Sequence, residues 1–338
     1  MKNAETAEYF KVLCADFPQW LWDYIDTHEL QTQKYISMTC GTIYSDLFES
    51  KTFYSSLDHS IAVALIVWNF THDKKQTLAG LFHDIATPAF KHCVDFLNGD
   101  CLKQESTEEL TTEFIKKSDD VLKLLQRDGI LVEEIDNYHI YPVADNDTPK
   151  LSADRLEYSL SNALFAYGLL DLDGVKEIYN DIEVQKNEFG EVELGFKTKN
   201  IARKFVKITS KMSVMYRDDR TRFSMQFIAD ILKKISDDGL ITVDQLYDLK
   251  EADVIKIIED SKYAGVFGSW RKAKAVNVSK EKPENVYYVH EKIKVRYIDP
   301  LCNGKRMSKN CKITEKMIAE NLAYNMDNYV FLDFNNFL

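Results

Sequence analysis

Four residues in apolar surroundings carry side chains that are suited to metal binding. His59, the adjacent pair His83 and Asp84, and Asp154 lie in the fragments LDHS, LFHD and SADRLEY, within stretches that have helical character. Two imidazole nitrogens and two carboxylate oxygens form a mixed donor set that holds a divalent transition metal well. A metal held in this way activates water for hydrolysis, so the four residues predict metal-assisted hydrolysis.

Less specific interpretations of single residues have to be weighed against this one. A lone His59 would more often be a hydrogen-bonded core histidine, and a second His-Asp pair, His72 and Asp73, lies in the polar segment NFTHDKK, where we expect a solvated turn. The motif residues combine a His in one apolar helix, a His-Asp pair at the end of a second and an Asp on a third. This combination favours a metal site. This donor set leaves the ion open among Fe, Mn, Ni, Co, Zn and Mg.

The composition indicates which elements must position these residues. The chain has 338 residues, 45% of them hydrophobic, with 12 Gly and 6 Pro, which favours a mainly α protein with a sizeable core. Periodicity and turn residues predict a small β-hairpin insertion and a C-terminal α+β segment. The expected elements are helices over 60–70, 76–85, 150–170 and about 204–235, a loop over 138–149, a hairpin over 183–199 and a strand over 286–298.

We expect four segments along the chain. They are an N-terminal helical segment over 1–50, a metal-binding core over 51–180, a hairpin and helical extension over 181–260, and a basic α+β segment over 261–338. The net charge is −11, yet residues 262–316 hold fourteen Lys and Arg against five Asp and Glu. This basic segment is expected to cover the pocket, bind a second nucleotide or form a subunit interface, with a solvated basic surface as the plainer alternative.

Composition also limits the surroundings in which the protein works. The acidic net charge argues against a general nucleic-acid binder. The six cysteines form no C-x-x-C pair, and we expect reduced thiols in a cytoplasmic protein. The apolar run IAVALIVW near the first motif is too short to cross a membrane. Homo-oligomers are common among soluble enzymes, and we expect one here.

The motifs resemble those of a known superfamily. The fragments LDHSIAVALIVW, LAGLFHDIATPAFKHCVDF and SADRLEYSL resemble the HD-domain phosphohydrolases, most of all the deoxynucleoside triphosphohydrolase branch, over roughly residues 35 to 250. The resemblance implies a helical HD-domain bundle with a metal held by His59, His83, Asp84 and Asp154. It also implies substrates that are phosphate esters or anhydrides, most often of nucleotides.

The resemblance further implies roles for residues around the metal. His92 would be a general acid that protonates the leaving oxygen, with Asp95 or Glu105 to orient the helpers; a surface histidine is the alternative for His92. This chain departs from the branch at three positions. It has Thr87 and Gln104 where the branch usually has His, and Ser56 where the branch has Arg.

Phosphate contacts are expected from two helices. Arg155 and Tyr158 follow Asp154, and the branch carries a basic residue and a Tyr at these places, although an ordinary surface Arg and a half-buried Tyr remain alternatives. Arg recognises phosphate by bidentate hydrogen bonds. Further basic residues that could pair with Asp218 and Asp219 instead are Lys211, Arg217, Arg220 and Arg222.

The sequence therefore predicts a metal-dependent phosphohydrolase that acts on a nucleotide or another phosphorylated small molecule. The expected substrate is a (deoxy)nucleoside triphosphate, cleaved by metal-activated water. One alternative is a phosphodiesterase of cyclic or oligomeric nucleotides. Another is a degenerate HD domain that binds nucleotide as a regulatory module, which the three departures favour and the complete ligand set opposes.

Overall fold

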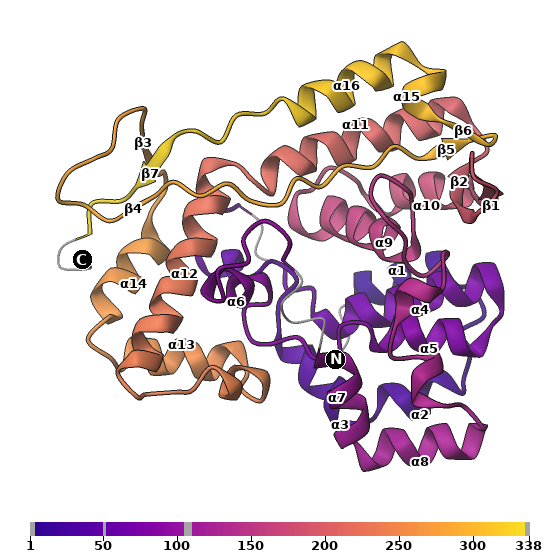
Figure 1. Ribbon diagram of the computed structural model, residues 1–338, viewed down its shortest axis with the longest axis horizontal. Helices are drawn as coiled ribbons and strands as arrows, with labels where there is room; N and C mark the ends of the chain where they lie inside the picture. Colours follow the sequence, from indigo (N-terminus) through magenta and orange to yellow (C-terminus); the bar gives the residue numbers. More distant parts are fainter. Residues whose placement is uncertain (1–3, 50–51, 105–109, 335–338) are drawn as a thin grey trace.

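The structure is a computed structural model that describes residues 4–49, 52–104 and 110–334. Helices dominate it, as the sequence predicts, and the strands form two small sheets. Within the described ranges, no helix combines the length and the apolarity that a bilayer crossing requires. Two hydrophobic cores organise the chain, and Figure 1 shows the helices that form them on opposite sides of the molecule. The predicted division into four segments stays a prediction.

The larger core brings together the N-terminal half and the helices that follow it. Its central helix is the apolar segment that contains the first motif histidine. The helices that contribute buried side chains to it are α1 (Ala4–Leu13), α2 (Leu21–Ile25), α3 (His28–Thr32), α4 (Ser56–Thr71), α5 (Lys74–Phe82), α7 (Thr111–Lys117), α8 (Asp119–Asp128), α9 (Ala153–Ser161), α10 (Leu172–Asn180), α11 (Lys199–Met215), α15 (Met307–Asn310) and α16 (Lys312–Leu322).

The smaller core is formed by later helices together with one short early helix. Figure 1 shows that early helix, α6, between the two groups of helices. The helices of the smaller core are α6 (His92–Leu97), α12 (Asp219–Asp237), α13 (Glu251–Glu259) and α14 (Ala264–Lys272).

The turn between α4 and α5 determines where the motif residues lie. Ser55 and Asp58 form a capping box at the start of α4. The helix ends at His72, which has a left-handed φ of 49°, and the Asp73 side chain then accepts backbone N–H groups at the start of α5. The prediction of a turn at this second His-Asp pair is confirmed. Gly80 lets the two helices approach, because a Cβ there would lie 3.3 Å from Val63 and Val67.

The helix that carries Asp154 is shorter than predicted. The expected helix over 150–170 begins only at Ala153, since Leu151 pairs with Leu194 in a β-bridge and Ser152 caps the helix. It changes to a π-turn over Asn162–Ala166. The motif residue therefore lies in the first turn of α9, close to the preceding loop.

The prediction of one long helix over 204–235 is wrong, because the chain forms two helices there. α11 ends at Met215, and Asp218 begins α12 by accepting the backbone N–H of Thr221. The hydroxyl of Thr221 in turn donates to the carbonyl of Met215, which fixes the break. A capping Asp such as Asp218 is a local signal for the start of a new helix, but the continuous helical periodicity of the segment outweighed it in the prediction.

The hairpin prediction is confirmed. β1 (Ile182–Lys186) and β2 (Val192–Phe196) pair antiparallel, and β2 also pairs with a late strand of the chain. The remaining strands are short and complete two sheets with the orders β1-β2-β5-β6 and β3-β7-β4. These strands are β3 (Asn277–Ser279), β4 (Tyr288–Val289), β5 (Leu301–Cys302), β6 (Lys305–Arg306) and β7 (Tyr329–Phe331).

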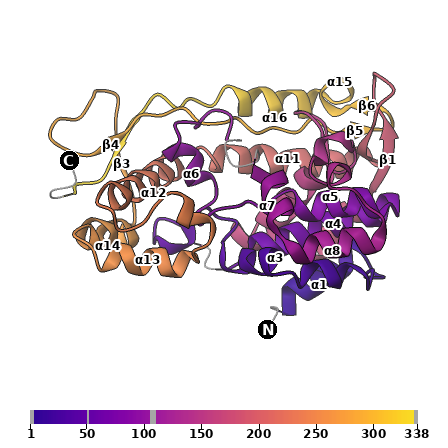
Figure 2. The ribbon, with the colours of Figure 1, turned by 60° about the horizontal axis from the view of Figure 1, so that its bottom comes forward.

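The strand predicted over 286–298 is largely wrong, since only Tyr288–Val289 pairs in a sheet. Residues 290–300, here called the strap, run in an irregular conformation from β4 to β5. Figure 1 shows the strap passing along α11, and Figure 2 shows it with α16 on the edge of the molecule opposite α1. Ile293 of the strap lies in the smaller core and Ile298 in the larger one, so the strap joins the two cores.

Candidate metal centre and the cavity around it

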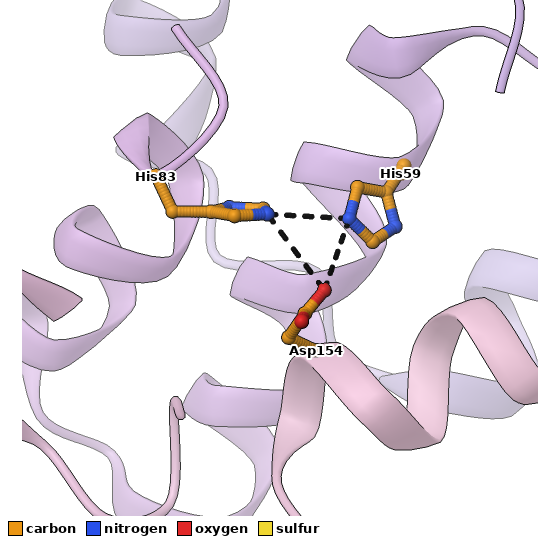
Figure 3. A group of neighbouring side chains, drawn as sticks. All are labelled: His59, His83 and Asp154. Carbon is orange, nitrogen blue, oxygen red and sulfur yellow. Dashed lines mark hydrogen bonds and ion pairs between the residues drawn. The ribbon is translucent and has the colours of Figure 1, made fainter. Parts of the chain in front are cut away.

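Three of the four predicted ligands, His59, His83 and Asp154, converge on one point, and the carboxylate of Asp84 lies beside them. The Nε2 atom of His59 lies 3.2 Å from Nε2 of His83 and 3.2 Å from Oδ1 of Asp154. Oδ2 of Asp84 lies 3.9 Å from Nε2 of His59 and 3.8 Å from Nε2 of His83. Figure 3 shows His59, His83 and Asp154 pointing toward one another from separate segments of the chain.

The hydrogen bonds behind the two histidines fit a metal site. Nδ1 of His83 lies 2.8 Å from the carbonyl oxygen of Gly80, and Nδ1 of His59 contacts the carboxylate of Glu157. These contacts let each Nδ1 keep a proton, so that each Nε2 lone pair would be available to a bound cation. Such a cation would displace the second proton that His59 carries in its absence. With the two carboxylates, this donor set fits a divalent cation.

Glu157 is a fully buried carboxylate behind the ligands and was not predicted. Its side chain has no exposed surface, and it also accepts hydrogen bonds from Tyr54 at 2.7 Å, Tyr9 at 3.2 Å and Ser161 at 3.3 Å. These donors offset the cost of burying its charge. The signal in the sequence was its position three residues after Asp154 on an amphipathic helix.

The charges of the cluster support one another. Burial disfavours a charged His59, but Glu157 and Asp154 raise its pKa to about 10. Burial would raise the pKa of Asp154, but the hydrogen bond with His59 lowers it to about 2. Burial would also raise the pKa of Asp84, yet the Lys91 ammonium and the two imidazoles hold it well below its usual range.

Lys91 is an unpredicted cation inside the site. Its side chain is 5% exposed, and its ammonium donates to Asp84 at 2.6 Å and to the hydroxyl of Ser56 at 3.3 Å. Both Lys91 and Phe90 have positive φ, at 45° and 66°, a conformation that costs non-glycine residues energy. Glu251 stabilises this turn by accepting the backbone N–H of Phe90 at 3.3 Å.

The ligands lie in the wall of a cavity of about 370 Å³. Three predicted residues line it together with the ligands: His92, Arg155 and Tyr158. Nδ1 of His92 lies 2.9 Å from Oδ2 of the fully buried Asp95, so the two residues share a helix face. Arg155 donates to Asn146 at 2.8 Å and to Asp145 at 3.2 Å.

Other predicted residues lie elsewhere. Lys211 is exposed on α11 and outside the cavity wall. Arg217 is fully buried and donates to Asn321 of α16, which fastens the C-terminal helix. Arg220 also lies outside the cavity wall and donates to Asp218 at 2.9 Å. Arg222 has no exposed side-chain surface and pairs with Asp219. The prediction for Glu105 lies outside the described residues.

Sequence reasoning missed several residues of the cavity. Tyr138 and His139 lie in the predicted loop, with the Tyr138 ring centroid 4.9 Å from that of His83. Nδ1 of His139 lies 2.8 Å from Asp145. Lys294 and Arg296 come from the strap, 140 or more positions after the last predicted ligand. Covering the pocket was one of the roles expected of their basic segment, but these two residues were not singled out. Periodicity carries no signal for contacts of this range.

Comparison with known proteins places the fold. No family model matches the chain. The uncharacterized protein YdhJ of Bacillus subtilis (strain 168) is 23% identical over 245 residues, which cover 72% of each chain. A phosphohydrolase from Bacteroides thetaiotaomicron VPI-5482 matches with a TM-score of 0.64 at 13% identity, over 95% of this chain and 97% of that one. A hypothetical protein from Aquifex aeolicus matches with a TM-score of 0.63 at 17% identity, over 94% of this chain and 93% of that one. The chain therefore has a fold similar to that of these two structures.

Replacing Glu157 by Gln is expected to weaken metal binding about 10- to 100-fold, because the His59 ring loses its anionic hydrogen-bond partner. Competition with a fluorescent chelator measures the affinity. Tyr9→Phe removes another donor to the same carboxylate and should change the affinity less than about 3-fold. A Glu157→Gln protein that folds and binds metal as tightly as the native protein would contradict the assignment.

Glu251 predicts a pH dependence of stability. Burial raises its pKa from 4.5 to about 7, so between these values the folded protein keeps a proton that the unfolded chain releases. The free energy of unfolding therefore falls as the pH rises through this interval, by on the order of 3 kcal/mol for the full shift. Glu251→Gln should remove this part of the slope in urea unfolding between pH 5 and 8.

The matched control for Glu251→Gln is Asp253→Asn, an exposed carboxylate in the first turn of the same helix. It should leave the slope unchanged in this pH range. The same slope in native protein and in Glu251→Gln would show that Glu251 does not titrate in this interval.

Proposed function

We propose that this protein is an HD-type metal-dependent phosphohydrolase that cleaves a nucleotide. The convergence of two imidazoles and the Asp154 carboxylate in the wall of a cavity, with Asp84 Oδ2 3.8 and 3.9 Å from the two imidazoles, carries this proposal. The similarity to a phosphohydrolase structure supports it, because the resemblance extends over nearly the whole of both chains.

The shape of the cavity favours a nucleotide over a small phosphate ester. α9 runs along its wall from Asp154 to Asn162, a distance of about 12 Å at 1.5 Å per residue. Beyond Asn162 the wall is aromatic: Tyr167 and Tyr216 lie with ring centroids 6.0 Å apart, and Asn162 donates to the Tyr216 hydroxyl. A charged end and an aromatic end suit phosphates and a nucleobase respectively.

The residues around the ligands suggest how hydrolysis proceeds. His59, His83, Asp84 and Asp154 would hold a divalent cation, which would activate a water molecule and polarise a phosphoryl oxygen. Arg155 and Tyr158 hold the phosphate from the α9 side. His92, oriented by Asp95, donates a proton to the leaving oxygen, a contribution worth roughly 10²- to 10⁴-fold. We propose a (deoxy)nucleoside triphosphate as the substrate, in agreement with the resemblance of the motifs.

A panel of nucleotides tests this proposal. The metal-supplemented native protein should hydrolyse nucleoside triphosphates, and chromatography of the products identifies inorganic phosphate, pyrophosphate or triphosphate. Asp84→Ala should lower kcat by about 10³-fold, since it removes a ligand of an ion that contributes several kcal/mol.

Asp147→Ala is the control, because it removes an exposed carboxylate from the wall of the same cavity. It should keep kcat within about 3-fold, as surface substitutions usually do. Turnover that survives in Asp84→Ala would contradict the metal-dependent reaction. Tight nucleotide binding without turnover in the native protein would instead support a regulatory module.

A further inference from the structure

The strap brings two cations into the cavity that no motif identifies. Lys294 and Arg296 line the same cavity as the four ligands, although they come from the segment between the two sheets. Arg296 also lines a small hollow next to Tyr158 and Tyr216, so it lies beside the α9 wall. The strap thus faces the residues that the proposed function assigns to the phosphate.

The strap is fixed along its length. Its backbone donates from Lys294 to the Cys101 carbonyl at 3.1 Å and from Asp299 to the Pro149 carbonyl at 2.9 Å. The hydroxyl of Ser213 on α11 donates to the carbonyl oxygen of Arg296. With Ile293 and Ile298 buried at either end, these bonds hold the position of the two cations.

Arg296 is oriented by a buried neutral partner. Its Nη2 donates to the Gln104 side-chain oxygen at 2.6 Å, and Gln104 is 2% exposed with a left-handed φ of 58°. Within the described part of the chain, no carboxylate lies within ion-pair distance of Arg296. A guanidinium has five N–H donors, so one bond to an amide leaves its charge and other donors for a ligand.

The chemistry of the two residues identifies the ligand. Arg binds phosphate with two parallel hydrogen bonds, and Lys adds a second positive charge. Resting on the proposed function, we infer that Arg296, oriented by Gln104, and Lys294 bind a phosphate group adjacent to the one that is cleaved. They select nucleoside di- and triphosphates over monophosphates.

Calorimetric titration of the full-length, metal-loaded protein tests this inference with two probes that are not hydrolysed. Methylenediphosphonate presents two linked phosphonates, and methylphosphonate presents one. Arg296→Gln should weaken binding of methylenediphosphonate about 10- to 100-fold, the usual worth of a charged hydrogen-bonded contact. It should weaken methylphosphonate less than about 3-fold, because the metal end of the site is unchanged.

Lys292→Gln is the matched control, since Lys292 lies on the same strap with an exposed side chain paired to Asp327. It should leave both affinities within about 2-fold of native. Lys294→Gln should reduce the preference for the diphosphonate in the same direction as Arg296→Gln. This second variant decides the question if Arg296→Gln does not fold.

Gln104→Met tests the positioning role by a double-mutant cycle. It should weaken the binding of methylenediphosphonate about 3- to 10-fold in the native background and have no further effect on that binding in Arg296→Gln. Additive effects of the two changes would show that Gln104 does not act through Arg296.

Failure of this inference is distinguishable from failure of the proposed function. The assignment of the strap cations would be overturned if Arg296→Gln lost affinity equally for both probes or for neither. It would also be overturned if the native protein did not prefer the diphosphonate. Metal-dependent hydrolysis by the native protein would still stand in those cases. Selective diphosphonate binding without nucleotide turnover would support the strap cations and overturn the hydrolase.

Discussion

The structure depends on bringing two imidazoles and the carboxylate of Asp154 to one point in the cavity wall, with the carboxylate of Asp84 beside them. Such a concentration of ionisable groups is costly unless each is paired or bound to a metal. The fold supplies a partner of opposite charge for one imidazole and one carboxylate: Glu157 contacts the ring of His59, and Lys91 neutralises Asp84. The tyrosines that donate to Glu157 come from α1 and the chain before α4, so the N-terminal segment supports the candidate metal centre.

Lys91 and the strap explain how this site differs from the motifs it resembles. Ser56 and Gln104 are uncharged at positions where the resemblance of the motifs implies Arg and His. In the structure each contacts a cation from another part of the chain, Lys91 at Ser56 and Arg296 at Gln104. The positive charge is thus supplied from the turn after α5 and from the strap. We interpret the departures as a rearrangement of the anion-binding residues rather than as their loss.

The sequence predicted what is local and periodic. The apolar helices, the hairpin, the turn at His72 and the convergence of His59, His83 and Asp154 followed from patterns within short segments. It failed where one interaction outweighs periodicity, as at Asp218, whose cap divides a long helical pattern in two. It also placed Arg217 at the substrate, whereas the structure uses that residue to anchor α16. The strap was predicted as a strand because its apolar and polar residues alternate. That alternation does not show whether a neighbouring strand is available to pair with it.

The most direct test of the metal centre is anomalous diffraction at the manganese edge from crystals grown with a manganese salt. We expect a single strong peak between the Nε2 atoms of His59 and His83 and the carboxylates of Asp84 and Asp154. Because Lys91 donates to Asp84 in the structure, we also expect this ammonium to move or to share the carboxylate when the ion binds. A map with no peak there, and with Lys91 still paired to Asp84, would show that these residues do not form a metal site.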